Sequence, residues 1–135
     1  MIVYLLDTNT ISDAARNPNG SAAKAIISHS DTILVTSVIV ACEIEFGLAL
    51  KKSNKLDRDM RVILEKIQVL PLESGASVHY GNLRAMLKTH GKPIGPNDLL
   101  IAAHALALGA ILVTNNEREF SRVPELKVEN WLRES

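Results

Sequence analysis

Residues 95–120 read GPNDLLIAAHALALGAILVTNNEREF, and the middle of this stretch is apolar except at His104 and Gly109. Pro96 predicts the beginning of a helix, Gly109 its end, and residues 110–113 a buried strand. The apolar run is about 15 residues long, shorter than the roughly 20 residues that a membrane-spanning helix needs. The stretch therefore predicts one helix-to-strand unit of a parallel sheet rather than a membrane anchor.

Polar side chains stand at both ends of this apolar unit. Asp98 falls in the first turn of the helix, and a polar group follows the strand, namely Thr114, Asn115, Asn116, Glu117 and Glu119. Polar groups held at the edges of a rigid apolar core are typical of functional sites in α/β folds. The end of this strand is therefore the first place to expect a site.

Apolar and amphipathic segments alternate along the rest of the chain. The sequence predicts strands at residues 2–6, 32–35 and 68–72, an edge strand around residues 127–128, and helices at residues 10–17, 21–30, 38–51, 56–67 and 74–90. This alternation predicts an α/β fold in which helices cover both faces of a parallel sheet, with ligands at the carboxyl ends of the strands. A chain of 135 residues has room for a single domain, residues 1–135.

Composition narrows the classes of function. The 15 basic and 15 acidic residues cancel, which argues against a protein that binds nucleic acid through bulk charge. Aromatic residues make up only 4% of the chain, so extended base-stacking platforms are not expected. The single cysteine, Cys42, lies in an apolar stretch and predicts a packed thiol in a reducing compartment. No basic region precedes Asp7, so the start of the chain predicts a strand rather than a signal peptide, and a cytoplasmic location.

Four oxygen-bearing side chains are expected to converge. Asp7 ends the first strand, Asn116 follows the last buried one, Asp98 begins a helix, and helical spacing turns Glu43 inward together with Val40. The group contains no cluster of histidine or cysteine, so it suits Mg²⁺ or Mn²⁺ and does not suit zinc. A carboxylate-bound metal ion of this kind indicates phosphoryl chemistry, because it polarises a phosphodiester and helps to generate hydroxide.

Each of these residues also has a purely structural interpretation. Asp7 could cap the helix that follows it, Asp98 could serve the helix dipole, and Glu43 could pair with a base in a buried salt bridge. His104 is expected to be a hydrogen-bonded core residue. The hydroxyl side chains that either orient the acids or cap helices and turns are Ser37, Thr8 and Thr114.

The most basic part of the chain is residues 51–61, which contain 5 basic residues against Asp57 and Asp59. A solvated loop and helix face is the favoured interpretation of this segment. Contact with nucleic acid or with a partner protein is the alternative.

Four motifs, in this order, give the chain a resemblance to a known family: LLDTN at residues 5–9, SVIVACEIEFG at residues 37–47, the stretch at residues 95–120, and VPELKVENW at residues 123–131. With these motifs the chain resembles the PIN-domain ribonucleases, specifically the VapC-type toxins of bacterial toxin–antitoxin pairs. The resemblance covers nearly the whole chain. It implies a three-layer α/β/α sandwich with a short, mostly parallel central sheet.

The resemblance also implies an activity and partners. The expected activity is that of a Mg²⁺-dependent endoribonuclease, with Mn²⁺ as the other candidate metal. A free enzyme of this kind would damage its own cell, which fits a small VapB-like antitoxin that blocks the acidic pocket. The apolar surplus on several helices suits a homodimer as well as an antitoxin groove.

Roles for the individual acids follow from the same resemblance. By position, Asp7 is the first metal ligand, Glu43 is the helix glutamate of the family, and Asp98 is the second principal metal ligand. The fourth acid is missing, because Asn116 stands where many relatives have aspartate. Glu119, one helical turn later, is expected to supply the missing charge, and the number of metal ions stays open.

Two other functions remain as alternatives to the ribonuclease. LLDTNT also resembles the first motif of the haloacid dehalogenases, in which Asp7 would be the nucleophile of a phosphatase or phosphotransferase. That motif, however, has aspartate at the position of Asn9. The second alternative is a catalytically silent interaction module, whose acidic pocket only receives an Arg or Lys of a partner.

Overall fold

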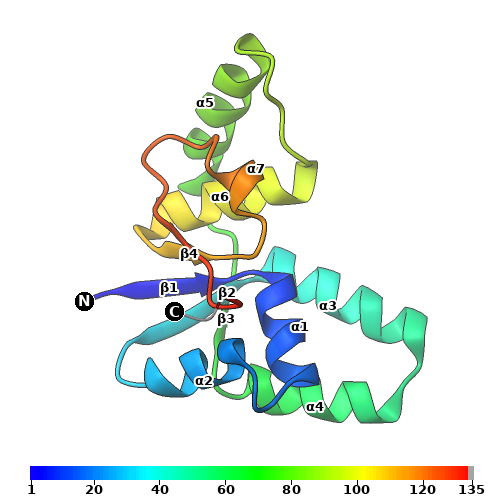
Figure 1. Ribbon diagram of the computed structural model, residues 1–135. Helices are drawn as coiled ribbons and strands as arrows, with labels where there is room; N and C mark the ends of the chain where they lie inside the picture. Colours follow the sequence, from blue (N-terminus) through cyan, green and yellow to red (C-terminus); the bar gives the residue numbers. More distant parts are fainter. Residues whose placement is uncertain (134–135) are drawn as a thin grey trace.

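The computed structural model describes residues 1–133 and is built on a five-stranded sheet (Figure 1). The strands are β1 (Val3–Leu6), β2 (Ile33–Ser37), β3 (Gln68–Leu70), β4 (Ile111–Val113) and β5 (Val128–Glu129). They lie in the order β3-β2-β1-β4-β5, and every neighbouring pair is parallel. The predicted parallel sheet is confirmed, and the carboxyl end of β1 lies at its centre between those of β2 and β4.

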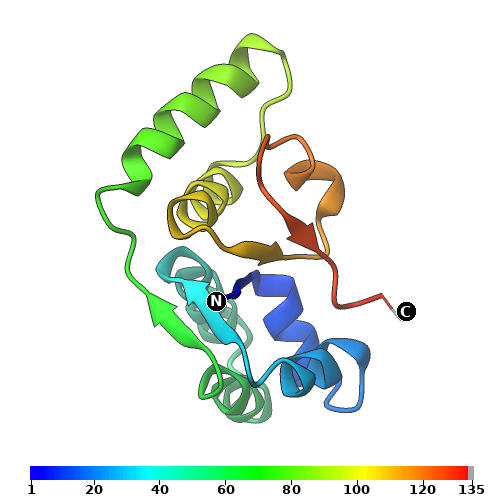
Figure 2. The same ribbon diagram turned by 90° about the vertical axis from the view of Figure 1, so that its left-hand side faces the viewer.

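Helices cover both faces of this sheet. They are α1 (Thr8–Arg16), α2 (Ser21–Ser28), α3 (Val38–Lys51), α4 (Asn54–Leu64), α5 (Ala76–Thr89), α6 (Pro96–Leu108) and α7 (Glu117–Phe120). Figure 1 shows α5, α6 and α7 above the sheet and α1, α2 and α4 below it. Figure 2, turned by 90°, shows the same separation into layers. This is the three-layer α/β/α arrangement that the sequence predicted.

The sheet forms the core because apolar side chains fill both of its faces. Leu5, Leu6 and Leu112 have no exposed surface. The small side chains of Ala102 and Ala105, which are also fully buried, let α6 lie close to the strands. α6 ends where predicted, since Gly109 takes up the left-handed conformation at φ 64° that glycine tolerates best.

The polar residues buried near α6 are hydrogen-bonded. His104 is 2% exposed, and its Nδ1 lies 2.8 Å from the Oγ of Ser37, so it is the hydrogen-bonded core residue that was predicted. Ser37 Oγ also accepts a hydrogen bond from Ile39 N (3.1 Å) and caps α3, so it serves the helix and not the acids. Among residues 1–133, no helix combines the length and the apolar character that a membrane span requires.

Two helices begin earlier than predicted because capping side chains decide their starts. α1 begins at Thr8, since Asp7 Oδ1 accepts a hydrogen bond from Thr8 N (2.8 Å). α4 begins at Asn54, since Ser53 Oγ accepts one from Leu56 N (3.2 Å). The single helical turn α7 was not among the predicted helices, although Glu119 was expected one helical turn after Asn116.

Two predictions about burial are wrong. Cys42 is exposed instead of packed. It lies between the positions of the buried face of α3, which is formed by Val40, Ile44 and Leu48. The helical spacing of residues 74–90 predicts that Val78 lies on the inward face with Leu83 and Leu87, but Val78 is 66% exposed. The reason is that the buried face of α5 is formed by Ala76, Leu83 and Leu87, and Val78, two residues after Ala76, lies on the opposite side of the helix.

Candidate functional site

The site begins with Asp7, at the point where β1 ends. Leu6 pairs with Val113 of β4 in the parallel register, so the residues that follow, Asp7 and Thr114, lie side by side. Asp7 N donates a hydrogen bond to Val113 O (2.9 Å), and Thr114 Oγ1 donates one to Asp7 Oδ2 (2.8 Å). Thr114 therefore orients this acid, which is one of the two roles predicted for it.

The Asp7 side chain is buried and has acidic neighbours. The residue is 5% exposed and forms no ion pair with any part of residues 1–133. Burial raises the pKa of Asp7, the hydrogen bonds from Thr114 and Thr8 oppose this rise, and the charges of Glu43 and Glu119 add to it. The capping role predicted for Asp7 is confirmed, but a buried carboxylate among other acids also favours a bound cation.

Glu43 reaches the site from α3. Its Oε1 accepts a hydrogen bond from Thr8 Oγ1 (2.6 Å), and its Oε2 accepts one from Asn97 Nδ2 (3.4 Å), a contact that was not predicted. The salt-bridge alternative for Glu43 is wrong, because no cation within residues 1–133 pairs with it. On α3 the ion pair belongs to Glu45 instead, whose two oxygens each lie 2.7 Å from a nitrogen of Arg61.

Asp98 and Glu119 form a second pair of acids. Asp98 lies half-buried in the first turn of α6, Glu119 lies in α7, and their carboxyl groups are within hydrogen-bonding reach of each other. Burial raises the pKa of Asp98 to about 7, and the hydrogen bond to Glu119 and the charges of Glu119, Asp7 and Glu43 act in the same direction. Asp98 therefore holds a proton close to neutral pH when no cation is bound.

Glu119 remains charged. Burial acts to raise the pKa of Glu119, but other contacts outweigh it and the pKa is lowered. These contacts are hydrogen bonds from Gly95 N (2.7 Å to Oε1), Asp98 and Asn116 Nδ2, and the charge of Arg122. Asn116 thus holds Glu119 through its amide. Glu119 brings a fourth acidic side chain to the cluster, so the structure brings all five predicted residues together at one edge of the sheet.

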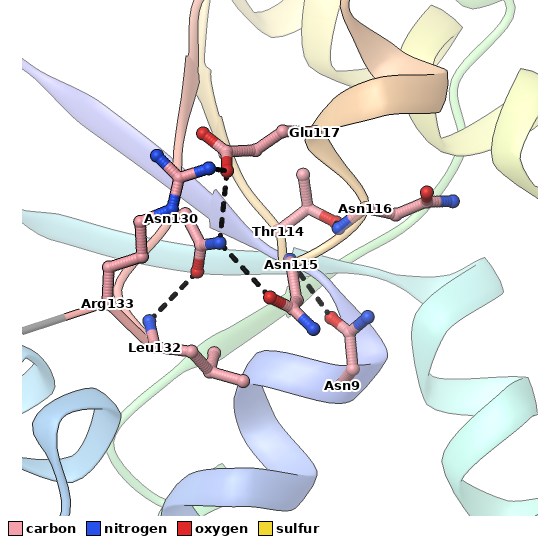
Figure 3. A network of polar contacts seen from close by, with 8 residues as sticks. All are labelled: Asn9, Thr114, Asn115, Asn116, Glu117, Asn130, Leu132 and Arg133. Atoms are coloured by element: carbon pink, nitrogen blue, oxygen red, sulfur yellow. Dashed lines mark hydrogen bonds and ion pairs between the residues drawn. The ribbon is translucent and has the colours of Figure 1, made fainter.

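A network of asparagines, which sequence reasoning missed, holds the segment after β4 (Figure 3). Asn130 lies beyond β5, and its Nδ2 donates to Asn115 Oδ1 and to Glu117 Oε2, both at 3.1 Å. Asn115 N in turn donates to Asn9 Oδ1 of α1 (3.4 Å), and Arg133 pairs with Glu117. The segment between β4 and α7 is therefore fixed between α1 and the chain beyond β5. Its sequence signal is weak, because asparagine is common in turns.

The basic segment 51–61 is largely neutralised by its neighbours. Lys55 pairs with Asp59 (2.7 Å), and Arg61 pairs with Glu45 and Asp57. This pairing agrees with the solvated-face interpretation. The charges of this segment that form no ion pair within residues 1–133 are those of Lys51, Lys52 and Arg58.

The acids converge, but they do not yet surround a single point. Within residues 1–133, no three side chains of the His, Cys, Asp and Glu types are placed so that they could hold a metal ion. Glu43 and Glu119 are held by hydrogen bonds to the protein, and Asp98 lies within hydrogen-bonding reach of Glu119. The donor set still fits a hard divalent cation, because a bound cation would compensate the negative charges of the acids that gather here.

A model of the PIN domain matches residues 4–126, which include every acid of the site. The chain belongs to the PIN-domain family. The family predicted from the four sequence motifs is therefore confirmed. PIN-domain nucleases depend on divalent metal ions, which agrees with the oxygen-only donor set.

Relatives of this PIN domain carry nuclease names. The chain is 35% identical to "Ribonuclease VapC2" of Rickettsia felis, over 96% of this chain and 98% of that protein. It is 36% identical to "tRNA(fMet)-specific endonuclease VapC" of Shigella flexneri, over 97% of this chain and 99% of that protein.

Two solved structures of toxin–antitoxin complexes share the fold. VapBC2 of Rickettsia felis, bound to a DNA fragment from its promoter, aligns with a TM-score of 0.86 at 34% identity, over 96% of this chain and 99% of that chain. VapBC-1 of nontypeable Haemophilus influenzae aligns with a TM-score of 0.80 at 34% identity, over 98% and 100%. The PIN-like three-layer fold predicted from the sequence is confirmed.

Proposed function

We propose that this PIN domain is the toxin of a type II toxin–antitoxin pair, with residues 1–135 acting as one domain that hydrolyses phosphodiester bonds of RNA. The nuclease names of its relatives support the enzyme class. One observation carries the assignment of the site. Asp7, Glu43 and Asp98 meet Glu119 at the carboxyl end of the sheet, and none of the first three has a cationic partner within residues 1–133.

The proposed cofactor is Mg²⁺, with Mn²⁺ as the other candidate, held by Asp7, Glu43 and Asp98. Both ions prefer oxygen ligands, and this donor set offers only oxygens. When bound, such an ion supplies Lewis acidity, which polarises the phosphodiester and makes an attacking water more acidic. Asn116 and Glu119 would complete the site, because the Asn116 amide holds the Glu119 carboxylate beside Asp98.

The side chains of the chain itself orient this reaction. Thr114 and the backbone of Thr8 bind one oxygen each of Asp7, so this carboxylate is fixed in one orientation. Thr8 also fixes one oxygen of Glu43, and the other oxygen has only the long contact to Asn97, so it is available to hold the metal ion. Water then attacks phosphorus in line and gives up a proton to solvent, and the 3′ oxygen leaves and takes up a proton from solvent, which gives 5′-phosphate and 3′-hydroxyl ends.

The proposed partner is a VapB-like antitoxin. The two structural relatives described above are both VapBC complexes. A basic side chain of such a partner would compensate the acids of the pocket in the same way as a metal ion. Phe46 and Leu50 of α3 are 67% and 69% exposed, and this apolar surface suits a homodimer as well as the antitoxin. A cytoplasmic location follows from a proposed RNA substrate and an antitoxin made beside the toxin.

The phosphatase alternative is not retained for a PIN domain. Asn9 stands where that motif wants aspartate, and its Oδ1 accepts a hydrogen bond from Asn115 N (3.4 Å), so this side chain holds a loop. The silent-module alternative differs from the nuclease in one measurable property, which is whether Mg²⁺ binds to the acids.

Titration calorimetry with MgCl₂ tests the proposed metal site. Asp98→Asn removes a proposed ligand and should weaken Mg²⁺ binding by at least about tenfold. Glu45→Gln is the matched control, because Glu45 is an exposed acid that pairs with Arg61 away from the cluster, and it should leave the affinity unchanged. Absence of Mg²⁺ binding in both the unmodified protein and the control would contradict the proposal and favour the silent module.

A further inference from the structure

A cavity of about 540 Å³ lies between α5 and the beginning of α6, outside the acidic cluster. Its walls include Tyr80, Arg84 and Lys88 of α5, Ile94 of the connecting loop, and Pro96 and Leu99 of α6. None of the residues that line it is acidic. Its volume lies within the range of small-ligand sites in proteins, which is about 300–1,000 Å³.

The cavity combines an aromatic ring with two cations. The guanidinium of Arg84 lies 5.9 Å from the centre of the Tyr80 ring, and its Nη1 donates a hydrogen bond to the Tyr80 hydroxyl (2.8 Å). Lys88 follows Arg84 by one helical turn, so it lies on the same face of α5. Neither Arg84 nor Lys88 forms an ion pair with a carboxylate of residues 1–133. Their charges are therefore available to an anionic ligand.

The cavity and the acidic cluster lie on two sides of one helical turn. Leu99 lines the cavity, whereas its neighbour Asp98 belongs to the acids. The same turn is tied to α7, because Gly95 N donates to Glu119 Oε1 (2.7 Å) and Arg122 Nη1 donates to the carbonyl of Pro93 (3.1 Å). An α-helix with its side chains is about 10–12 Å wide, so a short piece of a nucleic-acid strand spans from one side to the other.

We propose that this cavity binds a nucleotide of single-stranded RNA next to the scissile bond, with its base against Tyr80 and its phosphate on Arg84 and Lys88. This inference rests on the proposed ribonuclease function. The acids of the site repel phosphate, and the chain has no net charge, so the affinity for RNA has to come from local cations. One aromatic side chain beside basic ones is the minimal combination by which proteins bind single strands. The scarcity of aromatic residues excludes an extended platform but not this single subsite.

Fluorescence anisotropy with a labelled single-stranded RNA tests the subsite. An RNA of about twelve nucleotides has the length that single-strand binding sites cover, and EDTA prevents cleavage during the measurement. The double variant Arg84→Gln/Lys88→Gln should weaken RNA binding by about tenfold and reduce the slope of log affinity against log salt by about 0.7, since both side chains bind one phosphate and each neutralised phosphate contributes roughly 0.7. The matched control is Lys24→Gln/Lys66→Gln, which removes two other exposed charges and should change the affinity by less than about twofold. Tyr80→Ala should also weaken binding, whereas Tyr80→Phe should retain the stacking and most of the affinity.

Cleavage kinetics with Mg²⁺ separate a failure of this inference from a failure of the proposed function. We expect the double variant to raise KM for RNA by about tenfold while kcat stays within about twofold, because Arg84 and Lys88 do not contact the acids. Cleavage by the unmodified protein together with equal KM and equal RNA affinity in the double variant would overturn the subsite alone. Absence of Mg²⁺-dependent cleavage by the unmodified protein would overturn the proposed function, and the binding experiment would still decide whether the cavity holds RNA.

Discussion

Asp98 and Glu119 lie within hydrogen-bonding reach of each other across the gap between α6 and α7, although both side chains are acids. The pair is stable because Asp98 holds a proton, with its pKa raised to about 7, while Glu119 remains charged and accepts hydrogen bonds from Gly95 N and Asn116 Nδ2. Two acids that share one proton behave as a unit in titration. A divalent cation at this place would replace that proton.

Binding of Mg²⁺ should therefore release a proton from the protein below about pH 7, because Asp98 is protonated there in the metal-free state. Calorimetric titrations at pH 6 in buffers with different ionisation enthalpies measure this release directly. Asp98→Asn should abolish the buffer dependence, and Glu45→Gln should retain it. Equal binding enthalpies in all buffers would show that Asp98 does not hold the proton.

The metal-free protein should lose stability as the pH rises from about 4 to about 7. The folded protein holds the Asp98 proton up to about pH 7, whereas the unfolded chain releases it near 3.8, so the folded state binds more protons in this window and the free energy of unfolding falls as the pH increases. The raised pKa of Asp7 acts in the same direction. The lowered pKa of Glu119 acts in the opposite sense, but only below its ordinary value of 4.5.

Urea unfolding at several pH values, in EDTA, measures this dependence. Asp98→Asn should flatten the curve between pH 5 and pH 7, because the variant carries no titrating group at this position. Addition of Mg²⁺ should restore stability to the unmodified protein at pH 7. A free energy of unfolding that increases between pH 5 and pH 7 in EDTA would contradict the account of the paired acids.

Asn116→Asp should strengthen metal binding and lower the folding stability of the metal-free protein. The substitution adds a carboxylate beside Glu119 and removes the Asn116 Nδ2 donor that now holds Glu119, so like charges face each other unless a cation is present. The rise in Tm on addition of Mg²⁺ should therefore be larger in the variant than in the unmodified protein. An equal rise would show that position 116 lies too far from the metal to contribute a ligand.

Thr114→Val should lower both stability and metal affinity. Thr114 is fully buried, and its Oγ1 donates to Asp7 Oδ2 (2.8 Å) and accepts from Asn116 N (3.0 Å). Loss of the hydroxyl should therefore lower the free energy of unfolding by about 1–3 kcal/mol and raise the pKa of Asp7 further. Thr10→Val is the matched control, because Thr10 is equally buried but donates only to the carbonyl of Val113 (3.3 Å). It should destabilise the protein without changing Mg²⁺ affinity, and equal losses of affinity in both variants would argue against a specific role for Thr114.

The sequence predicts the order and type of the strands and of the longer helices because amphipathic or apolar segments alternate with turn residues. α4 is an amphipathic helix, whereas α6 is a long apolar segment that begins at Pro96 and ends before Gly109. The one-turn helix α7 has no periodicity to detect, and the early start of α1 depends on a cap by Asp7 that has to be seen in three dimensions. The burial of single helical positions is harder still to predict, since Cys42 and Val78 are exposed although each lies close to buried positions of its own helix.

The acids of the site are predictable because a parallel sheet brings the carboxyl ends of its strands to one edge. Asp7 and Asn116 follow this rule, and Asp98 and Glu43 follow from the start and the spacing of their helices. The partners of the acids are not predictable. The hydrogen bonds from Gly95 N to Glu119 and from Thr8 to Glu43 join segments that are far apart along the chain, and no local pattern marks them.

The central claim is that these acids form a metal-dependent ribonuclease site. Its most direct test is cleavage of transfer RNA and unstructured RNA by purified protein, free of any copurified antitoxin, with Mg²⁺ or with EDTA, beside Asp7→Asn and the control Glu45→Gln. Initiator transfer RNA belongs in this set, because one relative is named "tRNA(fMet)-specific endonuclease VapC". The account predicts cleavage that requires Mg²⁺, is retained by Glu45→Gln and is lost in Asp7→Asn. Cleavage that persists in EDTA or in Asp7→Asn, or no cleavage under any condition, would contradict it.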